Sequence, residues 1–179
     1  MERHPGGSEN TRKLLQLAEW KPGDRLLDLG AGGGEAVRTF RRLGLEAEGI
    51  DQAPKCDDGT VREGDFLHLE EVDNSIDICF SQCAFLVSGN QKRAIREAVR
   101  VLKTGGYLLL ADLDPEGLAA MTEAAGMKVL YVEDMTDEWR TYYLEALWSD
   151  TCCCEAYAGI ASRFKGKQMG YTMLAAVKE

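Results

Sequence analysis

A run of glycines between a buried strand and an amphipathic helix constrains the fold of this chain more than any other feature. Arg25–Leu29 is short and mostly apolar, which predicts a buried strand. Gly30–Gly34 predicts a tight turn, because glycine adopts backbone conformations that other residues avoid. Glu35–Leu43 then carries apolar residues at helical spacing. A strand, a glycine turn and a helix in this order begin a β-α-β unit.

Strands and helices continue to alternate along the chain. Further strands are predicted at Leu45–Ile50, Thr60–Glu63, Ser75–Phe80, Tyr107–Ala111, Lys128–Glu133 and Tyr171–Val177. Further helices are predicted after a Ser8 cap, at Asn90–Lys103 with Gly105-Gly106 closing it, from Asp114-Pro115 to Ala125, and after a Thr136 cap. This alternation indicates an α/β fold, with a mainly parallel sheet of seven strands and helices on both faces.

Length and charge narrow the class of protein. The 179 residues fit one domain, 1–179. A net charge of -9 repels phosphate backbones, which disfavours nucleic acid as a partner. No window approaches the roughly 18 consecutive apolar residues of a membrane span, and Met1–Asn10 is too polar for a signal peptide. We therefore expect a cytoplasmic protein with reduced cysteines and no membrane partner.

The glycine turn predicts a ligand site, because parallel sheets bind ligands beyond the carboxyl ends of their strands. A dinucleotide fingerprint would need a sixth-position glycine after Gly30, and Glu35 stands there. A nicotinamide-dependent oxidoreductase remains an alternative, since it shares the glycine turn. Asp51 ends the second predicted strand 21 residues after Gly30, the separation at which an acidic residue reaches the hydroxyls of a ribose.

Asp28, Gly30, Gly32 and Gly34 resemble the DxGxGxG motif of the class I S-adenosylmethionine-dependent methyltransferases. The resemblance covers about Leu14–Val132 and the closing strand, and it is strongest to the small-molecule, type 11-like branch. It implies a Rossmann-like sheet whose last strand is antiparallel. It also implies that Gly30, Ala31 and Gly32 pass along the methionine and ribose of the cofactor, and that Asp28 orients its amino group.

The same resemblance assigns the remaining cofactor contacts. Gln52 would flank the adenine, and Gly64-Asp65-Phe66 matches an adenine-recognition pattern in which Asp65 takes the exocyclic amine while Phe66 lines the ring. Ser81 would contact the methionine end. The segment Phe80–Phe85 lacks the Asn/Asp-Pro-Pro-Tyr tetrapeptide of many enzymes that methylate base or amide nitrogens, which disfavours that class. Phe85 is equally compatible with the core and with a substrate pocket.

The second half departs from the family pattern at residues 134–168, between the last two predicted strands. We interpret this insert as a lid that, with the N-terminal Met1–Asn10, covers the acceptor pocket. Residues 1–20 are expected to form an N-terminal helix or flap. His4, Phe85, Tyr142 and Tyr143 are the candidate substrate contacts. The stripe of Trp139, Tyr143 and Leu147 is more typical of helix core, and Arg163–Lys167 of a solvated loop.

Three consecutive cysteines, Cys152, Cys153 and Cys154, also lie in the insert. They lack the CxxC spacing of a zinc site, so no metal site is predicted. In an irregular loop two of them could capture a soft ion together with Cys56 or Cys83, as loop cysteines do in some arsenite methyltransferases.

The predicted function is methyl transfer from S-adenosylmethionine to an unidentified small-molecule acceptor. No catalytic residue is assigned, and His4, Tyr142 and Asp112 are the candidates if the acceptor must lose a proton. Besides the nicotinamide-dependent oxidoreductase, two alternatives stay open: a catalytically silent module that binds the cofactor and serves as a scaffold or partner, and a metalloid methyltransferase that uses the loop cysteines. The sequence predicts no oligomeric state.

Overall fold

The computed structural model describes residues 4–148 and 169–179, except for the side chains of residues 146–148. Its centre is one seven-stranded sheet in the order β3-β2-β1-β4-β5-β7-β6. The strands are β1 (Arg25–Leu29), β2 (Glu46–Asp51), β3 (Val61–Glu63), β4 (Ile76–Gln82), β5 (Leu102–Asp114), β6 (Met127–Asp134) and β7 (Gly170–Lys178). Among the strands of the described residues, only β7 runs antiparallel to its neighbours, β5 and β6. The predicted fold class is therefore confirmed.

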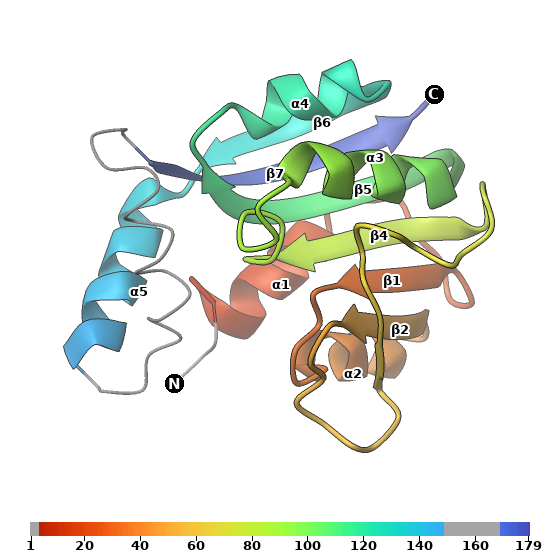
Figure 1. Cartoon of the computed structure of the whole chain (residues 1–179), viewed down its shortest axis with the longest axis horizontal. Helices are drawn as coiled ribbons and strands as arrows, with labels where there is room; N and C mark the ends of the chain where they lie inside the picture. The colour runs from red at the N-terminus through yellow and green to blue at the C-terminus, as the bar shows by residue number, and fades with distance from the viewer. Residues whose placement is uncertain (1–3, 149–168) are drawn as a thin grey trace.

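Helices cover both faces of this sheet (Figure 1). They are α1 (Gly7–Leu15), α2 (Glu35–Arg42), α3 (Gln91–Val101), α4 (Leu118–Ala124) and α5 (Thr136–Trp148). One buried cluster contains apolar residues of α1 and α2, with Trp139 and Tyr143 of α5 packed against it. A second cluster lies on the other face and contains apolar residues of α3 and α4. Each helix thus buries its apolar side against the sheet.

The order in which successive strands are added to the sheet reverses at β1. From β1 the chain proceeds outward to β2 and β3, and β4 then pairs with the opposite side of β1. Ligands of open α/β sheets bind at such a switch point, beyond the carboxyl ends of the strands. The glycine turn after β1 lies at this position.

Several predicted helix ends are wrong. The first helix begins at Gly7 after a left-handed Gly6, and the Ser8 side chain does not cap it. α3 ends at Val101, and β5 begins at the next residue. Gly105-Gly106 therefore lies inside β5 and does not close the helix. α4 starts at Leu118, although the Asp114 carboxylate still accepts hydrogen bonds from the amides of Gly117 and Leu118 at 2.6 and 2.8 Å.

The predicted Thr136 cap is also corrected. Its hydroxyl accepts a hydrogen bond from the Tyr171 amide at 3.0 Å and donates one to Asp134. The Met135 carbonyl accepts the first helical hydrogen bond, from the Trp139 amide. Thr136 therefore joins the start of α5 to β7.

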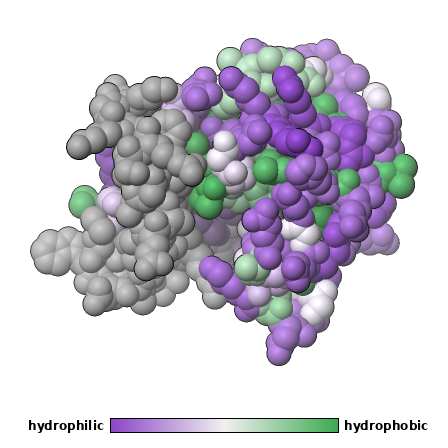
Figure 2. All heavy atoms as spheres, viewed as in Figure 1, coloured by the Kyte–Doolittle hydropathy of each residue, from purple (hydrophilic) through white to green (hydrophobic). Residues whose placement is uncertain are grey.

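The molecular surface in the view of Figure 2 is mainly hydrophilic, with apolar side chains in small separate groups. Among the described residues, no helix has the length and apolar character needed to cross a membrane.

Candidate cofactor site

The glycine turn is fixed by backbone hydrogen bonds to the neighbouring strand. The amides of Gly30 and Ala31 donate to the Ile50 carbonyl of β2 at 2.8 and 3.0 Å. Gly30, Gly32 and Gly34 all have positive φ, and Gly34 is the N-cap of α2. Glycine is favoured at each position because other residues are strained in this conformation. The turn therefore leads the chain directly from β1 into α2.

Gly30 and Gly32 are glycines for different reasons. A Cβ atom on Gly30 would lie 2.3 Å from the Ala84 Cβ, so the segment after β4 packs directly against this position. A Cβ on Gly32 would meet nothing within 4 Å. Gly30 is thus required by packing as well as by φ. Gly32 faces open space that a ligand can approach.

Asp51 lies beside this opening, as its spacing from Gly30 predicts. Its carboxylate accepts hydrogen bonds from the Gly32 amide at 2.8 Å and from the Ala53 amide at 2.9 Å. The side chain is half-buried at the end of β2. The structure therefore brings the acidic residue and the glycine turn together into one site.

Asp28 is buried beneath the turn, with 4% of its surface exposed. Burial, together with the nearby Asp51 and Glu35 carboxylates, raises the pKa of Asp28 from 3.8 to about 8. Within the described part of the chain, no hydrogen bond is formed by its carboxyl group. A buried carboxyl group of this kind is unfavourable until it meets a cation or a donor.

The third acidic residue of the site, Asp65, belongs to the segment after β3. It accepts hydrogen bonds from the Leu67 amide at 2.8 Å and contacts the His68 Nδ1 atom at 2.8 Å. Burial raises the pKa of Asp65, but hydrogen bonds from His68, the Leu67 amide and Gln52 outweigh it, and the net shift is downward. The carboxyl group is therefore an ionised acceptor, with the predicted Gln52 beside it.

Phe66 is 7% exposed, and its ring stacks on Phe85 with centroids 5.4 Å apart. Phe85 itself is 0% exposed and belongs to the core cluster of α3 and α4. Of the two roles left open for Phe85 by the sequence, the structure favours core packing. Phe85 contributes to the site by packing against the Phe66 ring.

Ser81 is fully buried, and its hydroxyl donates to the Leu29 carbonyl at 2.7 Å. The side chain joins the ends of β4 and β1, so its hydroxyl is already used within the protein. Any contact between Ser81 and a cofactor would involve its backbone.

Asp112, a candidate base, is 2% exposed near the end of β5. It accepts hydrogen bonds from the amides of Leu86 and Leu113 at 3.0 and 2.7 Å. Burial raises its pKa to about 7, although the amides of Leu86, Leu113 and Phe85 act in the opposite direction. Asp112 thus anchors the segment after β4, and its burial argues against direct contact with an acceptor.

The N-terminal segment reaches both the end of β4 and α5. Thr11 Oγ1 donates to the Gln82 Oε1 atom at 2.8 Å and lies 3.4 Å from His4 Nε2. Asn10 donates to Glu138 of α5 at 2.9 Å. Sequence reasoning missed Gln82, whose buried Nε2 atom has no partner among the described residues. The only available signal was its position directly after Ser81.

The aromatic residues of α5 pack together. Trp139 and Tyr143 stack with ring centroids 5.4 Å apart, and both are half-buried. Tyr142 is also half-buried. The core role predicted for the stripe fits Trp139 and Tyr143, whereas the Leu147 side chain lies outside the described residues.

Cys56 and Cys79 are free thiols, and Cys79 is fully buried, whereas Cys83 Sγ lies 3.2 Å from the Tyr171 hydroxyl. The part of the chain that is described contains no group of three or more His, Cys, Asp or Glu residues arranged to hold a metal ion. Cys152, Cys153, Cys154 and Arg163–Lys167 lie outside the described residues.

One cavity among the described residues lies away from this site. It has a volume of about 350 Å³ and is lined by residues such as Asp24, Asp77 and Lys103, at the amino ends of β1, β4 and β5. The glycine turn, Asp51 and Asp65 lie at the opposite ends of the strands. The cofactor site therefore rests on its chemistry and topology rather than on a deep hollow.

Comparison with known proteins finds similarity to methyltransferases. Residues 27–110 match the family model described as a methyltransferase domain. The glycine/sarcosine/dimethylglycine N-methyltransferase of Actinopolyspora halophila is 33% identical over 126 residues, which make up 59% of this chain and 21% of that protein. The 27-O-demethylrifamycin SV methyltransferase of Amycolatopsis mediterranei is 32% identical over 158 residues, covering 76% of this chain and 58% of that protein. This chain thus spans less than two thirds of either relative.

The fold agrees with that family. A solved structure of Haemonchus contortus phosphoethanolamine N-methyltransferase 2, in complex with S-adenosyl-L-methionine, is similar with a TM-score of 0.74 and 21% identity, over 98% of this chain and 53% of that one. Such a likeness establishes the shared fold. Residues 27–110 match the model of a methyltransferase domain, and the chain shares its fold with this solved methyltransferase structure.

Proposed function

We propose that this chain binds S-adenosylmethionine at the glycine turn and transfers its methyl group to a small-molecule acceptor. The observation that carries the proposal is the contact between Asp51 and the Gly32 amide, at 2.8 Å. A carboxylate at this place, beside a turn that is open to a ligand, is suited to accept hydrogen bonds from ribose hydroxyls.

The residues fit this cofactor in two respects. Gly32 leaves open the space that a Cβ atom would occupy, so the cofactor can lie close to the backbone. Asp28 offers a buried carboxyl group without a partner among the described residues, and an ammonium group would pair with it. A cofactor with ribose hydroxyls and a cationic amino acid end matches both features.

In this proposal, residues that follow different strands contact different parts of the cofactor. Gly30, Ala31 and Gly32 approach its methionine and ribose, Asp51 accepts from the ribose hydroxyls, and Asp28 orients the amino group. Gln52, Asp65 and Phe66 surround the adenine in the proposal, with Asp65 as acceptor for its exocyclic amine. The Ser81 backbone borders the methionine end.

The bound cofactor supplies an electrophilic methyl group and a neutral thioether leaving group. The chain itself has to align the acceptor with that methyl group and exclude water. Such alignment needs no covalent catalysis, so the site can act without a nucleophilic side chain. We assign no general base.

A small-molecule acceptor is supported by the relatives, whose names specify glycine, sarcosine, dimethylglycine and 27-O-demethylrifamycin SV. We place the acceptor beside α5 and the N-terminal segment. The Asn10–Glu138 hydrogen bond connects these two parts, and Thr11 contacts Gln82 at the end of β4. In this proposal α5 and residues 1–20 form the cover of the pocket, with His4, Tyr142 and Tyr143 near the acceptor.

Methyl transfer can be tested without knowing the acceptor. The full chain is incubated with S-adenosylmethionine carrying a trideuterated methyl group and with metabolite extracts, and mass spectrometry then searches for products heavier by the labelled group. Labelled products should appear with the native chain and be reduced with Asp51→Ala, which disturbs the ribose contact. Saturable cofactor binding without any labelled product would instead indicate the silent cofactor-binding module.

A further inference from the structure

The proposed adenine pair Asp65–Phe66 belongs to an irregular segment, residues 64–75, between β3 and β4. The backbone groups of such a segment need partners outside a strand ladder. Hydrogen bonds within it are short-range, such as those from the His68 and Leu67 amides to Asp65. Its position relative to the rest of the fold must therefore be set by other elements.

Three charged residues of α3 supply those partners. Arg93 Nε donates to the Leu67 carbonyl at 2.8 Å, and Glu97 Oε2 accepts from the Leu69 amide at 3.0 Å. Arg100 donates through Nη2 to the Leu69 carbonyl at 2.8 Å. These side chains are spaced at i, i+4 and i+7, so they lie on one side of the helix.

Arg100 is the centre of this arrangement. Besides Leu69, it donates through Nη1 to the Glu71 carbonyl at 2.9 Å, and its Nε and Nη2 atoms donate to Glu97 at 3.2 and 3.0 Å. The hydrogen bonds from Arg100 lower the pKa of Glu97, which keeps that acceptor ionised. A planar guanidinium can make these bonds simultaneously, whereas a lysine cannot.

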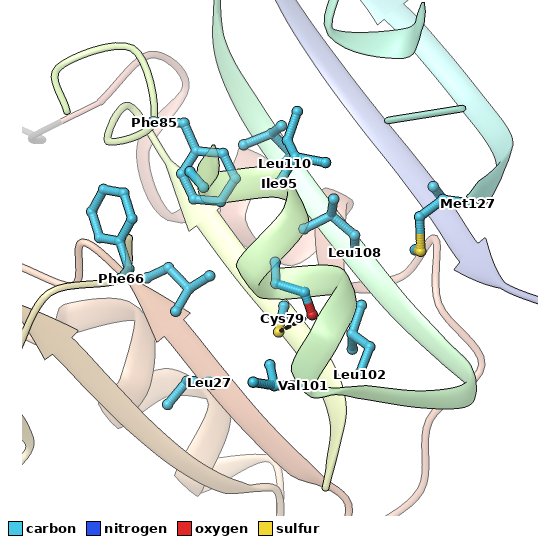
Figure 3. Close-up of a cluster of buried hydrophobic side chains, with 14 of the residues drawn as sticks. Leu27, Phe66, Cys79, Phe85, Ile95, Val101, Leu102, Leu108, Leu110 and Met127 are labelled. Carbon is cyan, nitrogen blue, oxygen red and sulfur yellow. Dashed lines mark hydrogen bonds between the residues drawn. The ribbon is translucent and has the colours of Figure 1, made fainter. Parts of the chain in front are cut away.

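Apolar contacts hold the same segment as well. Phe66 and Leu69 are 7% and 8% exposed and belong to the core cluster that contains Ile95 of α3. Figure 3 shows the Phe66 and Phe85 rings beside each other at one end of this cluster. Polar and apolar contacts therefore both anchor the residues that directly follow Asp65.

We propose that Arg93, Glu97 and Arg100 are positioning residues for adenine recognition, and that they act by fixing the backbone on which Asp65 and Phe66 stand. This inference rests on the proposed function, because it takes Asp65 as the acceptor for the adenine amine. Displacement of the segment moves that acceptor out of hydrogen-bonding range while the contacts of Asp51 and Gly32 stay in place. Loss of the α3 contacts thus selectively impairs recognition of the amine.

Titration calorimetry on the full chain tests this selectivity. The two probes are S-adenosylhomocysteine and its 6-deamino analogue, in which hydrogen replaces the exocyclic amine. The native chain should bind the analogue about tenfold more weakly, because the buried acceptor loses its donor. In Arg100→Ala this ratio should fall to about twofold, with most of the loss in affinity for the adenine ligand.

Two further variants and a control separate positioning from general destabilisation. Arg93→Ala removes a single hydrogen bond from an exposed side chain, so it keeps the test available if Arg100→Ala does not fold. Arg100→Lys keeps the charge without the guanidinium geometry and should show a reduced ratio. Arg96 is exposed on the same helix and makes no polar contact within the described residues, so Arg96→Ala should retain the native ratio.

Unchanged ratios in Arg93→Ala and in folded Arg100→Ala would overturn the positioning role while leaving the proposed function intact. Equal binding of the two probes by the native chain would also overturn it. Failure of the native chain to bind S-adenosylhomocysteine would overturn the proposed function itself, and the positioning role with it.

Discussion

Replacement of Asp28 by asparagine should stabilise the ligand-free protein and weaken cofactor binding. The pKa of this buried carboxyl group rises from 3.8 to about 8 because of burial and then because of Asp51 and Glu35. Between these values the folded state holds a proton that the unfolded state has lost. The contribution of Asp28 to stability is therefore complete below about pH 4 and decreases as the pH rises to about 8.

The size of the effect follows from the shift. At 1.36 kcal/mol per pKa unit, ionisation of Asp28 in the unfolded state costs the native protein about 4 kcal/mol of stability near pH 7. Asparagine removes this cost but buries an amide, which offsets about 1–3 kcal/mol if it stays unpaired. We expect Asp28→Asn to be about 1–3 kcal/mol more stable than the native chain near pH 7, with a smaller difference near pH 5.

Cofactor binding should change in the opposite direction. An ammonium group beside Asp28 favours the ionised carboxylate, so binding should release a proton and strengthen as the pH rises from about 6 to about 8. Asp28→Asn should lose this pH dependence and bind S-adenosylmethionine about 1.5–3 kcal/mol more weakly, the contribution of a hydrogen bond to a charged group.

Urea unfolding at several pH values measures the stability, and calorimetry in two buffers of different ionisation enthalpy measures the proton release. A variant that is less stable than the native chain near both pH values would refute the assignment of a buried, neutral Asp28. A variant with native affinity and unchanged proton release would refute its contact with the amino group.

Three further predictions concern the turn, the ribose contact and the cover. Asp51→Ala should weaken S-adenosylmethionine binding by about 1–3 kcal/mol in calorimetry, because the ribose hydroxyls lose their acceptor, and unchanged affinity would exclude Asp51 from the site. Gly30→Val should lower the unfolding temperature even without ligand, since its Cβ would lie 2.3 Å from Ala84, and a stable variant that binds normally would contradict the geometry of the turn. Tyr143→Ala should reduce methyl transfer while cofactor affinity stays within about threefold, under about 1 kcal/mol, and full activity would argue against α5 as the cover.

The fold was predictable because apolar residues recur at clear strand and helix spacings along the sequence. Every predicted strand is present, including the short one at Val61–Glu63. Helix ends were less predictable, because the residues that could cap a helix also have other partners. Thr136 illustrates this, since its hydroxyl accepts from Tyr171, which is far away in the sequence.

The residues of the candidate site were predictable where they directly follow a predicted strand. Asp51 and Gly32 meet as their spacing predicts, because parallel strands bring their carboxyl ends to the same edge. The buried hydroxyl of Ser81 and the contacts of Arg100 were not predictable. Both depend on which distant backbone carbonyl lies within reach, and no local pattern records that.

The central claim is that the glycine turn and Asp51 bind S-adenosylmethionine. Titration calorimetry of the full chain with S-adenosylmethionine, S-adenosylhomocysteine and NAD tests it most directly, with Gly32→Val as the variant that fills the open space at the turn. Saturable binding of the two sulfur ligands should occur with the native chain and be lost in the variant, and NAD should give no saturable heat. Saturable NAD binding without binding of S-adenosylmethionine would contradict the account.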